Sequence, residues 1–266
     1  MIIIGEKINS TLKSIRPAME SRDKAVIQDV AIRQINAGAN FIDVNAGMFH
    51  QNESEVLQWL IETIQEVTDV PFAIDSPSAK AILTGLQSNK NGKPIINSIT
   101  AEKARYDAII PMIKQFDAKV IALCMDDNGM PETVADRVSI ARTLIKNLTE
   151  EGVLMDDIFI DPMVRPIGTG SHYGTIAIET IRQVKNEFPD VHIACGLSNV
   201  SFGLPARKIL NQSFLVAAMA AGMDGAIVDP LDKKLMSFVY ATEALLGKDD
   251  YCMEFLTKFR EGEIEV

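Results

Sequence analysis

Short apolar runs alternate along this chain with longer segments in which apolar residues recur every three or four positions. Continuous apolar runs of about four residues are typical of parallel strands covered on both faces, because a half-exposed strand would alternate apolar and polar residues. Eight runs fit this description and predict eight strands: residues 1–4, 41–44, 71–74, 93–96, 120–123, 158–160, the run that begins at His192, and residues 225–228.

The segments between these runs have the periodicity of amphipathic helices. In residues 23–37, Ile27, Val30 and Ala31 fall on one face of the predicted helix. Pro111 lacks a backbone N–H, so we expect it to kink or divide the helix that contains it. Helices are predicted over residues 23–37, 53–67, 79–86, 101–116, 133–150, 175–188, 205–221 and 235–246, with a further helix at 251–260.

Eight strand-plus-helix units in one chain predict an α/β fold of a particular kind. Strands joined by helical crossovers are parallel, and eight of them close into a barrel that has no free edge. We therefore expect a single-domain (β/α)8 TIM barrel that spans residues 1–266.

Composition narrows the classes of partner. The formal net charge of −10 argues against nucleic acid, whose binding depends on clustered Lys and Arg. The chain start lacks the features of a signal peptide, and no apolar run reaches transmembrane length. Cys124, Cys195 and Cys252 have neither zinc-ligand spacing nor the density of a disulfide framework. We expect a soluble cytoplasmic protein with reduced thiols, no metal site and no membrane or nucleic-acid partner.

Polar residues close or follow most of the predicted strands. The carboxyl ends of the strands form the active face of such a barrel, so these side chains are expected to surround one site. Asp and Asn also begin turns and cap helices, and on that ground we interpret Asp43 and Asp126 as structural. The full set is Glu6, Asp43 with Asn45, Asp75, Asn97, Asp126, Asp161, Ser198 with Asn199, and Asp229.

This set is rich in hydrogen-bond acceptors and contains no histidine, lysine or cysteine. It favours binding of a neutral, donor-rich heterocycle over nucleophilic attack or metal ligation. A reduced pterin presents a 2-amino group and ring N–H donors together with one oxo acceptor, and two Asp with one or two Asn side chains would satisfy that edge.

Six short motifs lie at or beside these strand ends: residues 3–9 (IIGEKIN), 74–76 (IDS), 96–98 (INS), 160–162 (IDP), 196–201 (GLSNVS) and 218–227 (AMAAGMDGAI). Each motif alone is common, but together they are specific. On these motifs the chain resembles, over nearly its whole length, the methyltetrahydrofolate:corrinoid protein methyltransferases of the pterin-binding barrel superfamily.

The resemblance implies a role for each candidate residue. Asp75, Asn97 and Asp161 would hold the pterin ring, and Asn199 would be the catalytic residue that reaches N5 of the folate. The other substrate-binding candidates are Glu6 at the first strand, Gly196 and Ser198 lining the site, and Arg207 facing the benzoate-glutamate tail.

The reaction implied is transfer of a methyl group between N5 of methyltetrahydrofolate and the cobalt of a corrinoid. A separate corrinoid protein would carry that cobalamin-type group, and the methyltransferase would be a homodimer. Activation of N5 would come from hydrogen bonding or protonation, with Asn199 stabilising charge at N5 in the transition state. The direction of net transfer is left open by the sequence.

Three alternatives remain. Dihydropteroate synthase shares the barrel and the pterin contacts, but that family uses a Lys and a Ser-x-Arg pair on the last two strands, where this chain has Ser198-Asn199 and Val228-Asp229. A non-catalytic barrel that binds folate or docks a corrinoid protein is the second. A Schiff-base aldolase is the third and needs a lysine at a strand end, whereas we place Lys7 in a loop.

Overall fold

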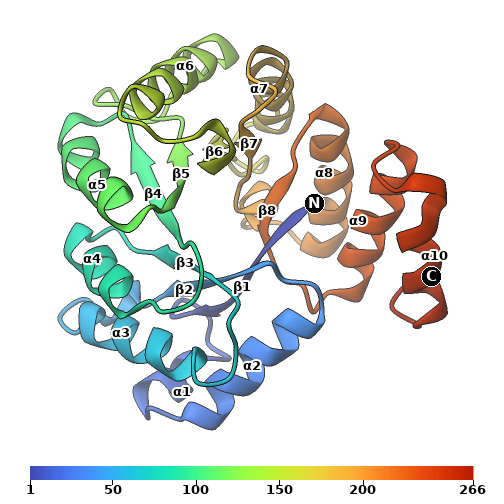
Figure 1. The fold of residues 1–266 in the computed structure, drawn as a ribbon. Helices are drawn as coiled ribbons and strands as arrows, with labels where there is room; N and C mark the ends of the chain where they lie inside the picture. The colour runs from blue at the N-terminus through green and yellow to red at the C-terminus, as the bar shows by residue number, and fades with distance from the viewer. Residues whose placement is uncertain (266) are drawn as a thin grey trace.

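An eight-stranded parallel sheet curves around a central axis, and helices cover its outer surface (Figure 1). The computed structural model describes residues 1–265. The sheet order is β7-β6-β5-β4-β3-β2-β1-β8, so each strand lies beside its sequence neighbours and β1 lies beside β8. The strands are β1 Ile2–Asn9, β2 Phe41–Asn45, β3 Phe72–Asp75, β4 Ile95–Thr100, β5 Lys119–Leu123, β6 Ile158–Asp161, β7 His192–Ile193 and β8 Gly225–Val228.

The barrel closes between β7 and β8. A parallel bridge joins Gly196 to Ile227, and the Ile227 N–H donates to the Cys195 carbonyl at 3.0 Å. The predicted (β/α)8 barrel is therefore confirmed. The seventh strand is shorter than the apolar run that begins at His192, because regular pairing stops after Ile193 although the Ala194 N–H still donates to the Ile160 carbonyl.

Ten α-helices and four short 3-10 helices are described. The α-helices are α1 Arg16–Glu20, α2 Lys24–Asn36, α3 Glu53–Ile64, α4 Ala79–Ser88, α5 Lys103–Phe116, α6 Val134–Glu150, α7 Tyr173–Glu187, α8 Arg207–Ala221, α9 Lys233–Leu245 and α10 Met253–Arg260. The 3-10 helices are η1 Gly47–Phe49, η2 Met155–Asp157, η3 Leu197–Ser201 and η4 Asp250–Cys252. Helix α10 lies outside the ring, beside α9 (Figure 1).

Local sequence signals start several of these helices. The side chains of Asp23, Ser78, Thr133 and Asp232 each accept a hydrogen bond from a backbone N–H in the first turn of α2, α4, α6 and α9. Such a cap contributes about 1 kcal/mol. Helix α5 is not divided at Pro111, because that residue lies on the exposed face, where the carbonyl that loses its donor is open to water.

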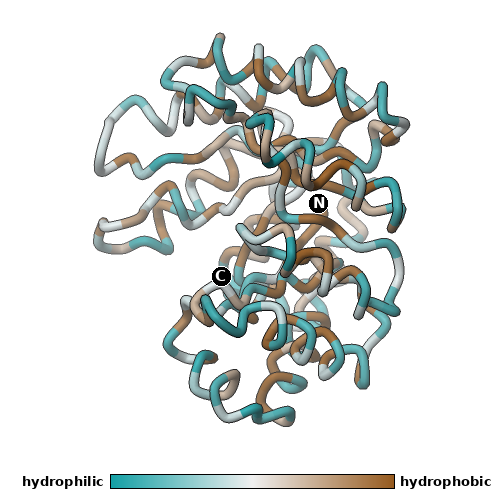
Figure 2. The backbone as a smooth tube through the Cα atoms, turned by 90° about the vertical axis from the view of Figure 1, so that its left-hand side faces the viewer, coloured by the Kyte–Doolittle hydropathy of each residue, from teal (hydrophilic) through white to brown (hydrophobic). Residues whose placement is uncertain are grey.

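The apolar core has two parts, on either side of the sheet. The larger part lies between the strands and the helices, and the smaller part fills the inside of the barrel. In Figure 2 the hydrophobic stretches run through the interior, and hydrophilic residues dominate the outer loops. Within residues 1–265, no helix has both the length and the apolar character that crossing a membrane requires. The smaller core consists of Ile4, Phe41, Ala73, Ile95, Ile121, Phe159 and Ala194.

Candidate active site

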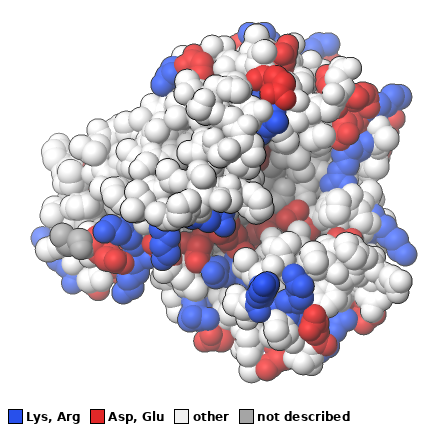
Figure 3. Space-filling view, turned by 180° about the vertical axis from the view of Figure 1, so that it is seen from behind, with Lys and Arg blue, Asp and Glu red and all other residues white. Residues whose placement is uncertain are grey.

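A polar layer lies directly above this inner apolar layer. Strand side chains alternate between the two faces of the sheet, so the residue two positions after an inward apolar residue also points inward. Ala73 is followed in this way by Asp75, and Phe159 by Asp161. Viewed from this end of the barrel, the molecule is hollowed, and Asp and Glu side chains gather in the hollow (Figure 3). The remaining members of the layer are Glu6, Asp43, Asn45, Asn97, Gly196 and Asp229.

Strands β2, β3 and β4 form one side of this layer. Asn45 pairs in register with Asp75, and Asp75 pairs with Asn97. The Asn45 Nδ2 donates to Asp75 Oδ2 at 2.8 Å, and the Asn97 Nδ2 donates to Asp43 Oδ1 at 3.2 Å. Two predicted pterin ligands, Asp75 and Asn97, are therefore neighbours on adjacent strands.

The pKa values of the two carboxyl groups on this side, those of Asp75 and Asp43, are raised above their usual range. Burial raises the pKa of Asp75 to about 6, aided by the nearby Glu53 and opposed by the Asn45 hydrogen bond and Arg105. Burial and the neighbouring Asp75 also raise the pKa of Asp43 well above its usual range. The interpretation of Asp43 as structural is compatible with its contact to Asn97, whose carboxamide it holds in place.

Asp161 ends β6 and is almost fully buried, with 8% of its surface exposed. The Met163 N–H donates to its Oδ1 at 2.7 Å, and within residues 1–265 this is the one hydrogen bond that its carboxylate accepts. Burial raises the pKa of Asp161 to about 7, against the effects of that N–H and of the Arg137 guanidinium. One carboxylate oxygen therefore remains available to a ligand.

Glu6 lies inside β1, further from the strand end than the sequence suggested. It lines a cavity of about 270 Å³ together with Leu197, Ser198 and Arg207. Burial raises the pKa of Glu6 to about 7, and Asp229 adds to this effect while Lys7 and Arg207 oppose it.

The placement of Lys7 in a loop is wrong. Lys7 lies within β1, where its Nζ contacts Asp229 Oδ2 at 2.8 Å. The ammonium group is thus held in an ion pair at the mouth of the barrel, and it is not presented free to a substrate carbonyl as an aldolase would require.

The segment after β7 turns sharply into η3. A Cβ at Gly196 would lie 3.2 Å from the Asn199 Nδ2, so the bare backbone lets the Asn199 carboxamide pack closely over it. Asn199 itself is exposed at the mouth. Arg207 begins α8 and donates to the Ser198 carbonyl at 2.7 Å and to the Ser201 Oγ at 3.1 Å. Gly196, Ser198, Asn199 and Arg207 are therefore together, as predicted.

Two arginines beside the site were not identified from sequence. Arg105 on α5 donates to the carbonyls of Ser76, Pro77 and Ser98, and Arg137 on α6 donates to the carbonyls that follow Asp161. The sequence contained one indication for Arg137, because this charged residue falls on the apolar face of its helix, where a buried charge requires a partner. It contained none for Arg105.

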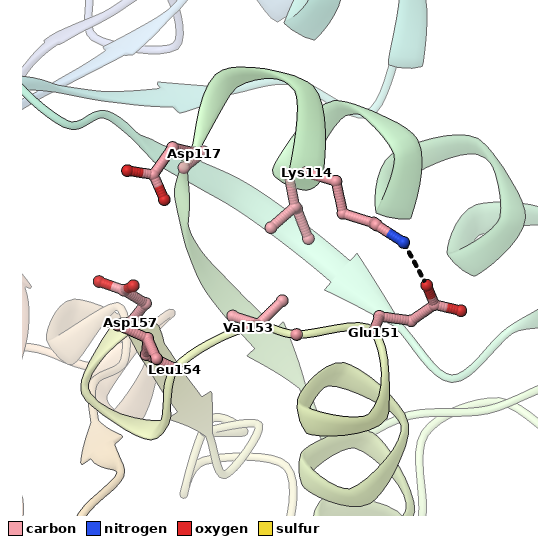
Figure 4. A pocket seen from close by; sticks show the side chains of 9 residues that line it. Lys114, Asp117, Glu151, Val153, Leu154 and Asp157 are labelled. Carbon is pink, nitrogen blue, oxygen red and sulfur yellow. Dashed lines mark hydrogen bonds and ion pairs between the residues drawn. The ribbon is translucent and has the colours of Figure 1, made fainter.

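A second hollow lies at the opposite end of the barrel, between the C-terminal ends of α5 and α6 (Figure 4). Its acidic residues are already neutralised by lysines. Lys114 contacts Glu151 at 2.8 Å, and Asp157 contacts Lys93 at 2.7 Å and Lys119 at 2.8 Å. This hollow therefore lacks the open acceptors of the candidate site. Among residues 1–265, no group of three His, Cys, Asp or Glu side chains is placed to hold a metal ion.

Comparison with known proteins finds relatives that align with most or all of this chain. The methylcorrinoid:tetrahydrofolate methyltransferase of Eubacterium limosum is 37% identical over 267 residues, covering 99% of this chain and 98% of that protein. The methionine synthase of Mycobacterium tuberculosis is 32% identical over an alignment of 241 positions that covers 86% of this chain but 20% of the synthase.

Solved structures of dihydropteroate synthases share the fold. The Vibrio fischeri enzyme superposes with a TM-score of 0.71 at 18% identity, covering 92% of this chain and 93% of that one. The Yersinia pestis enzyme with a pterine-sulfa conjugate gives 0.67 at 15% identity, with 92% and 94% covered. At such low identity these likenesses show the fold alone. The model of the family described as "Pterin binding enzyme" matches residues 5–229, and this chain belongs to the pterin-binding enzymes.

Proposed function

We propose that this protein is a methyltransferase that moves a methyl group between N5 of a tetrahydrofolate and the cobalt of a corrinoid carried by a separate protein. The Eubacterium limosum relative, which spans the whole chain, has a name that describes this activity. The order of that name, from methylcorrinoid to tetrahydrofolate, leads us to propose net transfer toward tetrahydrofolate.

One observation carries the assignment of the pterin site. Asp161 is buried and Asp75 is partly buried, yet within residues 1–265 each carboxylate accepts a single hydrogen bond. An unpaired buried acceptor is costly, so the free oxygen of Asp161, with Asp75 at the same end of the barrel, calls for a ligand that brings donors. The pterin 2-amino and ring N–H groups are such donors, and each charge-assisted bond would contribute about 1.5–3 kcal/mol.

Asn97 completes the pterin edge in this proposal. Its Nδ2 is engaged by Asp43, so its carboxamide oxygen is left to accept from a further ring N–H. The three residues lie on β3, β4 and β6, which are rigid elements, and this fixes the orientation of the ring before methyl transfer.

Asn199 is the proposed catalytic residue. When the methyl group passes to N5, the carbon–cobalt bond breaks with its electron pair left on cobalt, a carbon–nitrogen bond forms, and N5 loses its proton to water. Positive charge therefore develops at N5 through the transition state and persists until that proton has left. The Asn199 carboxamide oxygen would stabilise the N5–H while that charge develops, and in the reverse direction its Nδ2 would hydrogen bond the departing nitrogen.

The cavity beside Glu6 would receive the rest of the folate. The benzoate-glutamate tail is anionic, and Arg207 at the rim supplies a cation in a chain whose net charge is −10. Ser198 offers its hydroxyl at the same rim. Glu6 lies deeper, and with a pKa near 7 it would meet the tail in its protonated form more readily than an ordinary glutamate.

The deciding experiment mixes the purified protein with methylcobalamin and tetrahydrofolate and follows the absorbance of Co(I) under anaerobic conditions. We expect Co(I) and methyltetrahydrofolate to appear in equal amounts. Folate binding without any Co(I) would favour the non-catalytic barrel. Condensation of a pterin diphosphate with p-aminobenzoate in a coupled assay would favour a dihydropteroate synthase-like enzyme.

Three further expectations belong to this proposal. The native partner is a corrinoid protein, which affinity capture followed by cobalt analysis would identify. The enzyme is a homodimer, which light scattering of the purified protein would test. It works in the cytoplasm, which cell fractionation would test.

A further inference from the structure

Two arginine side chains surround the proposed pterin site without touching its carboxylates. Arg105 donates to the Ser98 carbonyl from Nε at 3.0 Å and from Nη2 at 2.6 Å, to Ser76 at 2.9 Å and to Pro77 at 2.7 Å. These carbonyls belong to the residues immediately after Asp75 and Asn97. One guanidinium thereby fixes the peptide groups that follow two pterin ligands.

Arg137 repeats this arrangement on the other side of the barrel. Its Nη1 donates to the Pro162 carbonyl at 2.7 Å and to the Met163 carbonyl at 2.8 Å, and its Nε donates to Pro131 at 3.2 Å. The side chain is completely buried. It therefore joins the loop after β5 to the loop after β6, directly behind Asp161.

The loop that Arg137 holds also orients the Asp161 carboxylate. Met163 adopts a left-handed backbone conformation, with φ of +62°, and its N–H donates to Asp161 Oδ1. Such a conformation costs about 1 kcal/mol or more for a residue with a side chain, so it persists where neighbouring contacts enforce it. Two hydrogen bonds from Arg137, one of them to the Met163 carbonyl, supply that enforcement.

We infer that Arg105 and Arg137 are positioning residues for folate binding: each orients the strand-end loops and places a positive charge beside Asp75 or Asp161, while occupying none of the carboxylate oxygens itself. Direct ion pairs would have stabilised the same acids but occupied the oxygens that the ligand needs. This inference rests on the proposed function, and it adds residues that the resemblance did not assign.

The charge environment of Asp161 makes the inference testable by titration. The ionisable groups that face it are Arg137 from α6, Cys124 after β5 and Cys195 after β7. Arg137 is the cation among them, and burial already raises the pKa of Asp161 to about 7. Removal of the guanidinium is therefore expected to raise the pKa of Asp161 further, by roughly one unit.

The first measurement needs no folate. Carbon-13 NMR of labelled aspartate carboxyl groups would give the pKa of Asp161 in the wild type, in Arg137→Lys and in Arg137→Met. We expect the Met variant to shift that pKa upward and the Lys variant to leave it nearly unchanged. Arg142→Met is the matched control, because Arg142 lies on the same helix but pairs with Glu187 at the surface.

The second measurement is the affinity for tetrahydrofolate as a function of pH. In Arg137→Met we expect roughly tenfold weaker binding near neutral pH that partly recovers above about pH 8, because Asp161 ionises again there. Arg137→Lys is expected to weaken binding at every pH, since an ammonium lacks the planar, fixed set of donors with which the guanidinium reaches three separate carbonyls. A loss that is uniform with pH in the Met variant, with an unchanged Asp161 pKa, would overturn the inference.

Arg105→Met covers the case in which the buried Arg137 variants do not fold, since Arg105 is partly exposed. The groups that face Asp75 are Arg105, Glu53 and Asp43, so the same experiment there follows the pKa of Asp75. An upward shift with weaker folate binding supports the inference, and unchanged values contradict it. Failure of the wild type itself to bind folate would refute the proposed function. The ligand-free titration would still show whether Arg105 and Arg137 act on the pKa values of Asp75 and Asp161.

Discussion

The two ends of the barrel differ in how their acidic side chains are paired and in the direction in which the pKa of each is shifted. Strand β6 has one such acid at each end, four residues apart. Asp157, just before the strand, contacts two lysines, and although burial acts to raise its pKa, Lys119 and Lys93 outweigh that effect and lower it. Asp161, at the other end, contacts no lysine within residues 1–265, and burial raises its pKa to about 7.

Strand β7 also begins at the end of the barrel that carries Asp157, which we call the paired end because its acids contact lysines. Asp224 accepts from Lys185 Nζ at 2.9 Å and from the Ile193 N–H at 2.8 Å, and it contacts His192 Nδ1 at 3.1 Å. Burial acts against ionisation, but these partners lower the pKa of Asp224 to about 2. His192 is thus a structural residue. Acids at this end form ion pairs that stabilise the fold. At the other end Asp229 is paired with Lys7, but within residues 1–265 the Asp75 and Asp161 carboxylates form no ion pair.

The largest expected effect is on the rate of methyl transfer. It comes from the end of the barrel that carries Asp75, Asp161 and Asn199, which we call the open end. Asn199→Ala should lower turnover at saturating substrates, because it should raise the activation free energy by about 2.7–4 kcal/mol, as loss of one transition-state hydrogen bond typically does. The melting temperature should not change, because Asn199 is exposed. The measurement is the rate of Co(I) formation, and turnover equal to the wild type would remove Asn199 from the mechanism.

The next effect separates affinity from stability at the open end. Asp161→Asn should weaken tetrahydrofolate binding by about 1.5–3 kcal/mol, because a charge-assisted hydrogen bond becomes a neutral one. Its free energy of unfolding near pH 8 should rise by on the order of 1 kcal/mol, since burying the charged form opposes folding. Asp75→Asn should act in the same direction. Calorimetric titration and urea unfolding test both, and unchanged affinity in both variants would contradict the pterin assignment.

The paired end should respond in the opposite way. Asp157→Asn and Asp224→Asn should each lower the free energy of unfolding by about 1–3 kcal/mol, because the lysines lose a negatively charged hydrogen-bond partner. Folate affinity should stay at the wild-type value. These variants are the matched controls for Asp161→Asn and Asp75→Asn, and a weakened affinity here would mean that the contrast between the two ends has no functional meaning.

The sequence predicted much of this architecture because parallel strands buried on both faces leave continuous apolar runs. It also predicted that Asp75, Asn97 and Asp161 lie at the same end of the barrel, since the carboxyl ends of parallel strands share one face. It misplaced Lys7, because β1 continues through a bulge where polar residues replace the apolar run. It did not show how Asp43 orients Asn97 or how Arg105 and Arg137 hold the loops, because those contacts join segments that are distant along the chain.

The smallest expected effect is proton release on folate binding. It is also the most direct test of whether Asp75 and Asp161 bind the pterin. Free Asp161 and Asp75 have pKa values of about 7 and about 6 and are partly protonated near pH 6.5. Pterin donors favour their ionised forms, so affinity should rise as pH increases through this window and level off above it.

The decisive measurement is calorimetric titration with tetrahydrofolate near pH 6.5, in two buffers that differ in ionisation enthalpy. We predict release of about one proton per folate bound, a smaller release in Asp161→Asn, and none near pH 9. Binding with no proton exchange near pH 6.5, or with proton uptake, would contradict the claim that these carboxylates receive the pterin.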